Sequence, residues 1–428
     1  MIKIKRRYIE KIETTFVIFS LFLYTNAVFP VVSSGGHSEG EPVSGGGISF
    51  LPSLIYRLFL LIGVISFVFI KPYLKTVFNL AIINKYLLIF TLLALASTVW
   101  SGYDKTLLRA ISFSCTYLFS IYFAVRYTLK QQLILISKCF LIVLILSIIF
   151  VVLLPKYGIM GGIHAGAWRG VFNHKNFLGK MMMICDIVFI LLHINKEQRS
   201  LSTYFGIFAS TILLIMSKSS SSLGNFMVLM VVLLVLRTWR WRFEIMIPAL
   251  VGTAILSILA NLWYQENAAI LFASVGKDPS LSGRTDIWGI IYDIGLRKIW
   301  LGYGYESFWR GFSGPSAEVW YAHDWHPPHA HNGFLDLFVT LGLVGLIIFI
   351  FSFLSSLYQS FMTLRYLTTE SEGFWPIISL FFLILSNLTE SGLMHENNIY
   401  TVIYISSSYS LSIITHNKHQ KNYKSLTT

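Results

Sequence analysis

The sequence contains few charged residues and few cysteines. Of its 428 residues, 12% are Asp, Glu, Lys or Arg, and 55% are hydrophobic. Soluble domains carry about 25% charged residues, so this composition excludes an ordinary water-soluble domain. The three cysteines, Cys115, Cys139 and Cys185, all lie in apolar stretches. That placement argues against disulfide bonds and against a metal held by cysteine.

Long apolar stretches recur along the whole chain. We count about twelve, each of roughly 15 to 24 mostly uncharged residues, which is long enough to cross a hydrocarbon core of about 30 Å as a helix. They lie at 14–32, 54–70, 84–100, 107–125, 132–154, 178–194, 203–217, 221–236, 245–262, 334–356, 375–392 and 398–415. Because lipid offers no partners to backbone groups, each crossing must be helical. The sequence therefore predicts an all-α polytopic membrane protein, with residues 1–428 forming a single membrane domain.

Basic residues are distributed unevenly along the chain. A net charge of +13 would suit a nucleic-acid partner, but Lys and Arg gather in alternate polar segments, above all 1–15, 237–243 and the C-terminal tail. This is the positive-inside pattern, so the charge predicts orientation in a membrane and no nucleic-acid partner. We expect a bacterial inner-membrane protein with cytoplasmic termini and a long periplasmic loop, 263–331, between helices 9 and 10. A cleaved signal peptide is the competing interpretation of the first apolar stretch.

Ionisable residues are scarce within the apolar stretches. Asp186 is the acidic residue nearest to mid-depth, and a structural carboxyl group bonded between helices explains it equally well. No inverted internal repeat is visible. Transporters usually need ionisable groups at mid-depth, and many are built from inverted repeats. A transporter or flippase of lipid-linked sugars is therefore the alternative from another functional class, and we expect the chemistry in the polar loops.

The loop 263–331 is rich in aromatic residues. It holds six of the eleven tryptophans, and its seven acidic and five basic residues suit a hydroxyl-rich ligand better than a polyanion. Flat amphipathic rings match the faces of sugars, so we expect Trp288, Trp309 and Trp325 to contact acceptor sugars. The helical spacing of Trp288, Ile291 and Ile294 predicts a short amphipathic helix at about 285–297.

Four histidines lie close together at the end of this loop. The spacing of His323, His326, His329 and His331 lacks the i, i+4 pair of a helical zinc site, and no cysteine completes a ligand set. We therefore predict no metal, and a histidine-ligated metal is the weaker alternative. His331 immediately precedes the tenth apolar stretch, where a helix N-terminus would keep the imidazole neutral and able to accept a proton. An interfacial histidine with only hydrogen-bonding duties is the competing interpretation.

Cationic side chains occur in three outer loops. They are Arg169 and Lys175, Lys218, and Arg284. Guanidinium and ammonium groups bind a diphosphate and stabilise the charge that develops on it as it leaves. Arg169 and Arg284 also lie in glycine-containing turns, where backbone amides can approach an anion. Each of the four could instead be an ordinary solvated loop charge.

Several motifs occur together in this order along the chain. They are TVWSGYDKTLLRA (98–110), GVFNHKNFLG (170–179), SKS (217–219), SGRTDIWGII (282–291), WLGYGYESFW (300–309), PPHAHNGFLDLFVTLGLVGL (327–346) and NLTESG (387–392). With them the chain resembles the O-antigen ligase and polymerase superfamily, and most of all its ExoQ-like exopolysaccharide polymerases. The resemblance covers most of residues 95–400.

The resemblance implies a GT-C-like glycosyltransferase that inverts the anomeric centre and needs no metal or other cofactor. Its donor would be an undecaprenyl-diphosphate-linked oligosaccharide and its acceptor a glycan. Arg169 and Arg284 match arginines that bind the diphosphate, and His331 and Asn332 match the family's histidine motif. Lys218 stands where ligases often have arginine, and Glu390 matches an acidic residue of the late motif. We expect Asn332 and Glu390 to contact the acceptor sugar.

The same resemblance leaves the acceptor open. A second lipid-linked repeat unit would make the protein a polymerase, which the ExoQ-like motifs favour, and a chain-length regulator would then be a candidate partner. Lipid A–core sugar or a protein as acceptor would make it an O-antigen ligase.

Overall fold

The computed structural model describes residues 2–38, 50–238, 284–323, 326–364 and 370–427, together with a few single residues between these ranges. Within them the chain is built from α-helices and has no strand. The longer helices are α1 (Ile2–Tyr24), α3 (Leu51–Ile70), α4 (Leu74–Ile83), α5 (Lys85–Ala96), α6 (Thr106–Arg126), α7 (Leu129–Leu153), α9 (Lys175–Ile194), α10 (Leu201–Met216), α11 (Ser220–Thr238), α13 (Arg284–Leu296), α15 (Gly333–Leu364), α16 (Glu370–Thr389) and α17 (Ile399–Thr427). The shorter ones are α2 (Phe29–Ser33), α8 (Pro155–Gly158) and α14 (Ala317–Ala322).

The helices confirm the predicted all-α membrane fold. Eleven of the predicted apolar stretches coincide with helices, and the remaining stretch, 245–262, falls almost entirely outside the described residues. Seven of the described helices are long and apolar enough to cross a membrane, and α10 and the α5 region are shorter apolar helices. The chain is therefore a multi-pass membrane protein.

The first helix ends earlier than its apolar stretch. We predicted 14–32, whereas α1 ends at Tyr24 and the short helix α2 begins at Phe29. Asn26 and Val28 between them adopt positive φ angles of 54° and 69°, which an α-helix cannot contain. Hydrophobicity alone could not predict this break.

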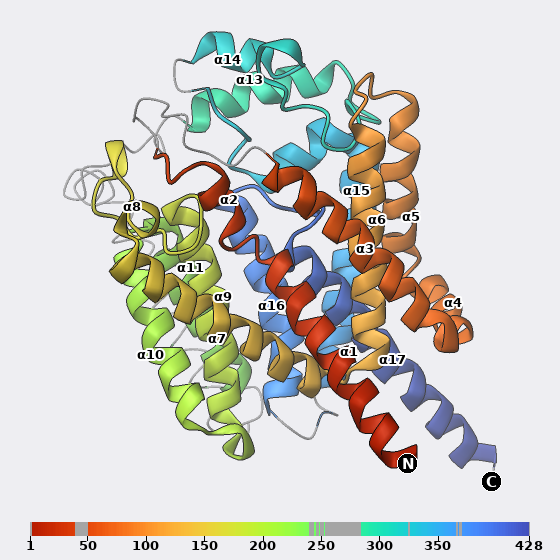
Figure 1. The fold of residues 1–428 in the computed structure, drawn as a ribbon. Helices are drawn as coiled ribbons and strands as arrows, with labels where there is room; N and C mark the ends of the chain where they lie inside the picture. The colour runs from red at the N-terminus through yellow and green to blue at the C-terminus, as the bar shows by residue number, and fades with distance from the viewer. Residues whose placement is uncertain are drawn as a thin grey trace.

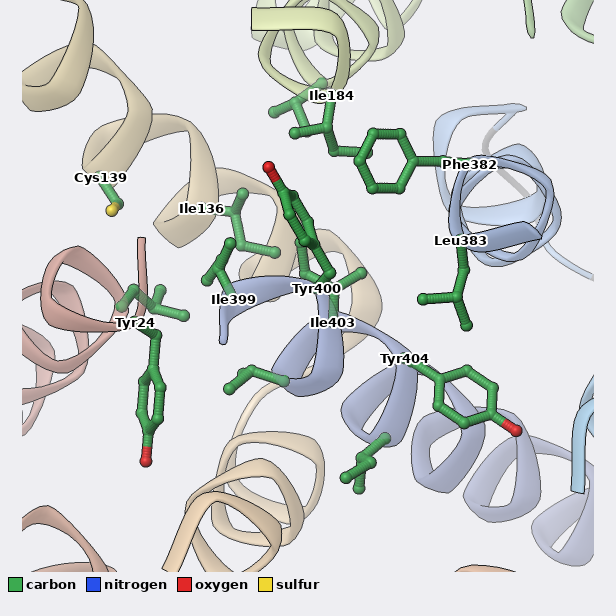
Figure 2. Packing of buried hydrophobic residues seen from close by; sticks show 14 of the residues in the cluster. Tyr24, Ile136, Cys139, Ile184, Phe382, Leu383, Ile399, Tyr400, Ile403 and Tyr404 are labelled. Carbon is green, nitrogen blue, oxygen red and sulfur yellow. The ribbon is translucent and has the colours of Figure 1, made fainter. Parts of the chain in front are cut away.

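The helices form a bundle with its loops gathered at the ends (Figure 1). Helices α13 and α14 lie at one end, and both termini lie at the opposite end. In the interior, Tyr400 of α17 lies near Ile136 of α7, Ile184 of α9 and Phe382 of α16, as Figure 2 shows. All three cysteines are buried and free, as predicted.

Asp186 is part of the packing between α9 and α10. Its carboxylate accepts hydrogen bonds from the hydroxyl groups of Ser210 at 2.8 Å and Thr211 at 2.9 Å. These contacts favour the structural interpretation of this acidic residue over a role in transport.

The predicted amphipathic helix is also present, as α13. It packs on α15 through Ile287, Ile291 and Ile294, all of which are buried.

Helix α15 is interrupted at Gly342, where φ is 65° and ψ is −167°. The loop 299–304 bonds to the opened helix. Tyr303 and Gly304 donate their backbone N–H groups to the carbonyl groups of Val339 and Thr340, at 2.9 and 2.8 Å. Leu343 donates in turn to Ile299 at 2.8 Å. The kink therefore anchors the WLGYGY motif beside the N-terminal part of α15.

Candidate functional site

A histidine–carboxylate pair lies where three distant motifs meet. His331 precedes α15, Glu390 follows α16, and Asn176 is in the first turn of α9. His331 Nδ1 lies 3.1 Å from Glu390 Oε2, and the Asn176 amide donates to Glu390 Oε1 at 2.8 Å. The two side chains of the pair are only 15% and 13% exposed. When Nδ1–H donates to the carboxylate, Nε2 keeps its lone pair and can accept a proton, as in the histidine–carboxylate pairs of known hydrolases.

The turn that carries His331 is held by its own neighbours. The backbone N–H of His331 donates to His329 Nδ1 at 3.2 Å, and the two ring centroids are 4.2 Å apart. Burial lowers the pKa of His329 to about 3, so this ring is neutral. Asn332 caps α15, because its side-chain oxygen accepts the N–H groups of Phe334 and Leu335 at 3.0 and 3.2 Å. The side-chain oxygen of Asn332 is thus engaged, and the predicted sugar contact would have to be made by its NH₂ group.

Two of the predicted sugar-binding tryptophans brace the same turn. The Trp309 indole donates to Asp336 Oδ1 at 2.7 Å, and the Trp288 indole donates to the Ala330 carbonyl at 2.7 Å. Ala330 N–H in turn donates to Asp336 Oδ1 at 3.2 Å. Both indole N–H groups are therefore engaged within the protein, and the predicted contact with a sugar would have to be made by the ring faces. Trp325 lies outside the described residues.

A second charged group, the Glu306–Glu396 cluster, comprises Arg109, Tyr305, Glu306, His395 and Glu396. Arg109 lies 3.2 Å from Glu306 Oε2, and His395 Nε2 lies 3.4 Å from Glu306 Oε1. The Tyr305 hydroxyl donates to Glu396 at 3.2 Å. Burial raises the pKa of both Glu306 and Glu396 to about 7, and burial lowers the pKa of His395. The cluster joins α6, the 300–310 loop and the 391–398 segment.

Arg169 lies in a separate set of contacts and is fully buried. Its guanidinium donates five hydrogen bonds of 2.5 to 3.1 Å, to the carbonyl groups of Gly36, His37, Lys156 and Tyr157 and to the hydroxyl of Ser38. A guanidinium has five N–H groups, so all of its donors are engaged. We therefore assign Arg169 to the loop structure, and a contact with a diphosphate would require these bonds to break.

The other predicted cationic residues lie at the starts of helices or in a turn between two helices. Lys175 is the first residue of α9, next to Asn176, and so its backbone lies beside the pair. Lys218 is exposed in the turn between α10 and α11, with φ of 51°, and its ammonium reaches over Gly166. Arg284 is the first residue of α13, but its side chain lies outside the described part of the structure.

Three side chains around the pair offer atoms of the kind that bind metals. One atom each of His329, His331 and Glu390 lie within 4.8 Å of one another. Catalytic zinc sites use three such ligands and an open position. Here, however, both Glu390 oxygens already face protein groups, the amide of Asn176 and Nδ1 of His331. An ion bound to Glu390 would therefore compete with the contacts that this carboxylate makes to His331 and Asn176.

Sequence reasoning missed several residues of this region. Asn176, Arg109, Glu306 and His395 were not singled out, although the first three lie in the motifs HKN, LLRA and YES, and the fourth in SGLMHENN. A polar or charged residue inside one of these motifs was the available signal. What it could not reveal was which of these residues meet across the fold.

Comparison with known proteins supports the resemblance drawn from the motifs. Residues 205–350 match the family model described as O-Antigen ligase. This range includes Arg284 and His331. A stretch of 88 residues is 32% identical to the exopolysaccharide production protein ExoQ of Rhizobium meliloti (strain 1021), and it spans 20% of this chain and 20% of that protein. The chain is thus a multi-pass membrane protein that resembles the O-antigen ligase and polymerase superfamily and shares an ExoQ-like segment.

Proposed function

We propose that this protein is a polysaccharide polymerase, an inverting GT-C-type glycosyltransferase. It would join undecaprenyl-diphosphate-linked oligosaccharide repeat units at the periplasmic face of a bacterial inner membrane. The observation that carries the proposal is the His331–Glu390 pair, at 3.1 Å, in which a candidate base is oriented by a carboxylate that Asn176 also holds. The similarity to O-antigen ligases supplies the reaction class.

In the proposed reaction an acceptor hydroxyl attacks the anomeric carbon of the donor sugar. A new C–O bond forms, the bond from that carbon to the diphosphate oxygen breaks, and undecaprenyl diphosphate leaves with the electron pair. The proton of the hydroxyl passes to His331 Nε2, while Glu390 stabilises the resulting imidazolium through Nδ1–H. Attack from the face opposite the diphosphate inverts the anomeric centre.

The diphosphate would be held by Arg284, with Lys218 and Lys175 as further cations. A guanidinium offers two parallel donors to phosphate oxygens, and it can take the place of a divalent cation in stabilising the leaving group. Arg169 is not included, because its five donors bind the protein itself. No metal or other cofactor is required.

A polymerase is favoured over a ligase by the ExoQ-like segment, since that relative is named for exopolysaccharide production. A ligase that transfers glycan to lipid A–core is the second candidate, favoured by the match to O-antigen ligases. A transporter of lipid-linked sugars has less support, because Asp186, the predicted mid-depth charge, is bonded to Ser210 and Thr211.

The test is reconstitution of the purified protein in lipid vesicles with undecaprenyl-diphosphate-linked repeat units. A polymerase gives a ladder of products that differ by one repeat unit, in excess chelator as well as in its absence. A single transfer that requires lipid A–core would identify a ligase. Movement of the donor across the vesicle membrane with no new glycosidic bond would identify a transporter.

The role of His331 is tested with two histidine variants, of which one is the matched control. His331→Ala should strongly slow formation of the ladder, whereas His193→Ala, at the end of α9 opposite to Asn176, should leave it intact. A ladder that persists in His331→Ala would remove this histidine from the mechanism. Activity lost in chelator and restored by one divalent cation would overturn metal independence and return attention to the histidines.

A further inference from the structure

Lys180 is a charged residue in an apolar position. It lies in the second turn of α9, and its side chain is only 4% exposed. The ammonium lies 4.7 Å from the centre of the Tyr400 ring. Tyr400 itself lies between α7, α9 and α16 in the interior of the bundle (Figure 2). Nothing in the proposed mechanism so far uses this lysine.

Among the described residues, the Lys180 ammonium has no hydrogen bond and no ion pair within 4 Å. A contact with one aromatic ring replaces only part of the hydration that a buried ammonium loses. Methionine or leucine would fill the same space without this cost. The presence of a charge at such a position therefore indicates a function other than stabilising the fold.

The ammonium points toward the segment that follows Glu390. A Cβ atom placed on Gly392 would lie 3.4 Å from Lys180 Nζ, so the absence of a side chain there leaves room for the lysine. Glu390 is the carboxylate whose charge acts on Lys180. The other titratable groups that face Lys180 and Glu390 are His329, from the turn before α15, and His395, from the 391–398 segment. The positive charge of Lys180 acts on both of these histidines.

We propose that Lys180 is a positioning residue for the transfer reaction. Its buried charge keeps Glu390 ionised, and the ionised carboxylate holds His331 with Nδ1–H toward itself and Nε2 toward the acceptor. The inference rests on the proposed function and adds a residue to it. Because Lys180 acts through Glu390, it changes the ionisation of the pair without touching donor or acceptor.

The test compares the pH dependence of kcat in the wild type, Lys180→Met, Lys180→Arg and Lys196→Met. Lys196 is an exposed lysine just beyond the opposite end of α9. Loss of the cation makes Glu390 harder to ionise and His331 easier to protonate, and both effects move the acid limb to higher pH. A shift of about one pH unit is expected for Lys180→Met, with roughly 10-fold lower kcat on the acid side. The donor KM should not change. Lys180→Arg and Lys196→Met should keep the wild-type limb.

Two further measurements separate positioning from other roles. Lys180→Met should have little added effect in a Glu390→Gln background, because the carboxylate it acts on is gone. It should also unfold at the same temperature as the wild type or higher, because it removes an unpaired buried charge. An unchanged acid limb, a raised donor KM with kcat retained, an equal loss in Glu390→Gln, or a clearly lower unfolding temperature would each overturn the proposal.

Failure of the proposed function is a separate outcome. It would appear as a wild-type protein that transfers no sugar at any pH. The inference about Lys180 would then be decided by nuclear magnetic resonance of the His331 ring, which needs no turnover. A ring titration that moves in Lys180→Met but not in Lys180→Arg supports the inference, and one that stays in place in Lys180→Met overturns it.

Discussion

In the proposed reaction Arg284 binds the leaving diphosphate, and His331 accepts the proton of the attacking hydroxyl. Arg284→Ala removes a charge contact that strengthens as the diphosphate leaves, so we expect a loss of about 3 kcal/mol, or ~10²-fold in rate. Arg284→Lys should recover only part of it, because an ammonium lacks the planar fork. His331→Ala should slow transfer by roughly 10²- to 10⁴-fold while donor binding persists. Transfer rates and donor binding with lipid-linked units check both expectations.

The result that contradicts this division of labour is specific. If donor binding falls in His331→Ala as far as it does in Arg284→Ala, the histidine is a binding residue and another base must be found.

Arg169 should matter for folding and not for the donor. Arg169→Leu leaves four carbonyl groups and one hydroxyl without their donor, and each lost bond to a charged group costs about 1.5–3 kcal/mol. We expect a much lower unfolding temperature and less inserted protein, with an unchanged donor KM in the molecules that fold. A stable Arg169→Leu protein with a raised donor KM would restore the predicted role in diphosphate binding.

The Glu306–Glu396 cluster should make stability depend on pH. The pKa of each carboxyl group is raised by burial from 4.5 to about 7, so the folded state binds more protons than the unfolded state between these values. The contribution of these two carboxyl groups to the free energy of unfolding is therefore fully present below about pH 4.5, and it is lost as the pH rises through about 7. Glu396→Gln cannot ionise and should lose less stability than the wild type between about pH 5 and 8. Unfolding temperatures at the two pH values provide the measurement, and an equal fall in both proteins would contradict the expectation.

Burial is what the sequence could not reveal at the scale of single residues. Arg169 and Arg284 look alike in the chain, each within a turn that contains glycine, and we predicted the same role for both. The carbonyl groups that surround Arg169 come from residues more than 100 positions away as well as from nearby ones. No local pattern contains that information. His331, by contrast, could be singled out from the sequence because its position before an apolar stretch is a local property.

At the scale of elements, periodicity predicted helices well and their interruptions poorly. The spacing of Trp288, Ile291 and Ile294 correctly predicted α13. The end of α1 at Tyr24 and the kink of α15 at Gly342 were not predicted, because each depends on backbone angles within an apolar stretch. A glycine in such a stretch is ambiguous until its partners are known.

Gly342→Ala should disrupt the junction between α15 and the WLGYGY loop. At Gly342 φ is 65°, and a Cβ atom would lie 2.2 Å from the Trp300 carbonyl oxygen. We expect a loss of stability of more than about 2 kcal/mol, from backbone strain and the clash together. The control is Gly224→Ala in α11, where nothing lies within 4 Å of the added atom. It should stabilise the helix by up to ~1 kcal/mol. Equal unfolding temperatures for the two variants would show that the kink tolerates a side chain.

At the scale of the whole molecule, the proposed function requires one particular end of the bundle to face the periplasm. Helices α13 and α14 lie at the end opposite the termini (Figure 1). In a background without the three native cysteines, we expect Ser313→Cys to react with an impermeant thiol reagent in intact cells. Lys196→Cys should react only after the membrane is permeabilised. Both positions are exposed. The reverse pattern would invert the orientation and remove the periplasmic mechanism.

The class of fold could be predicted because lipid imposes it on any chain with repeated long apolar stretches. The site could be predicted only in part. Its candidate base, His331, could be recognised from local sequence, but the contacts of Glu390 with His331 and with Asn176 depend on helices that are distant in sequence.

Because the residues of this site are far apart in sequence, the ribosome makes them at different times. A ribosome makes Asn176 first and His331 much later, and Glu390 follows only after α16 has been made. Until then a nascent chain in the membrane carries the proposed base, His331, without its carboxylate. The protein would therefore remain inert toward lipid-linked sugars throughout its own synthesis, and an unfinished copy released early could bind the donor without consuming it.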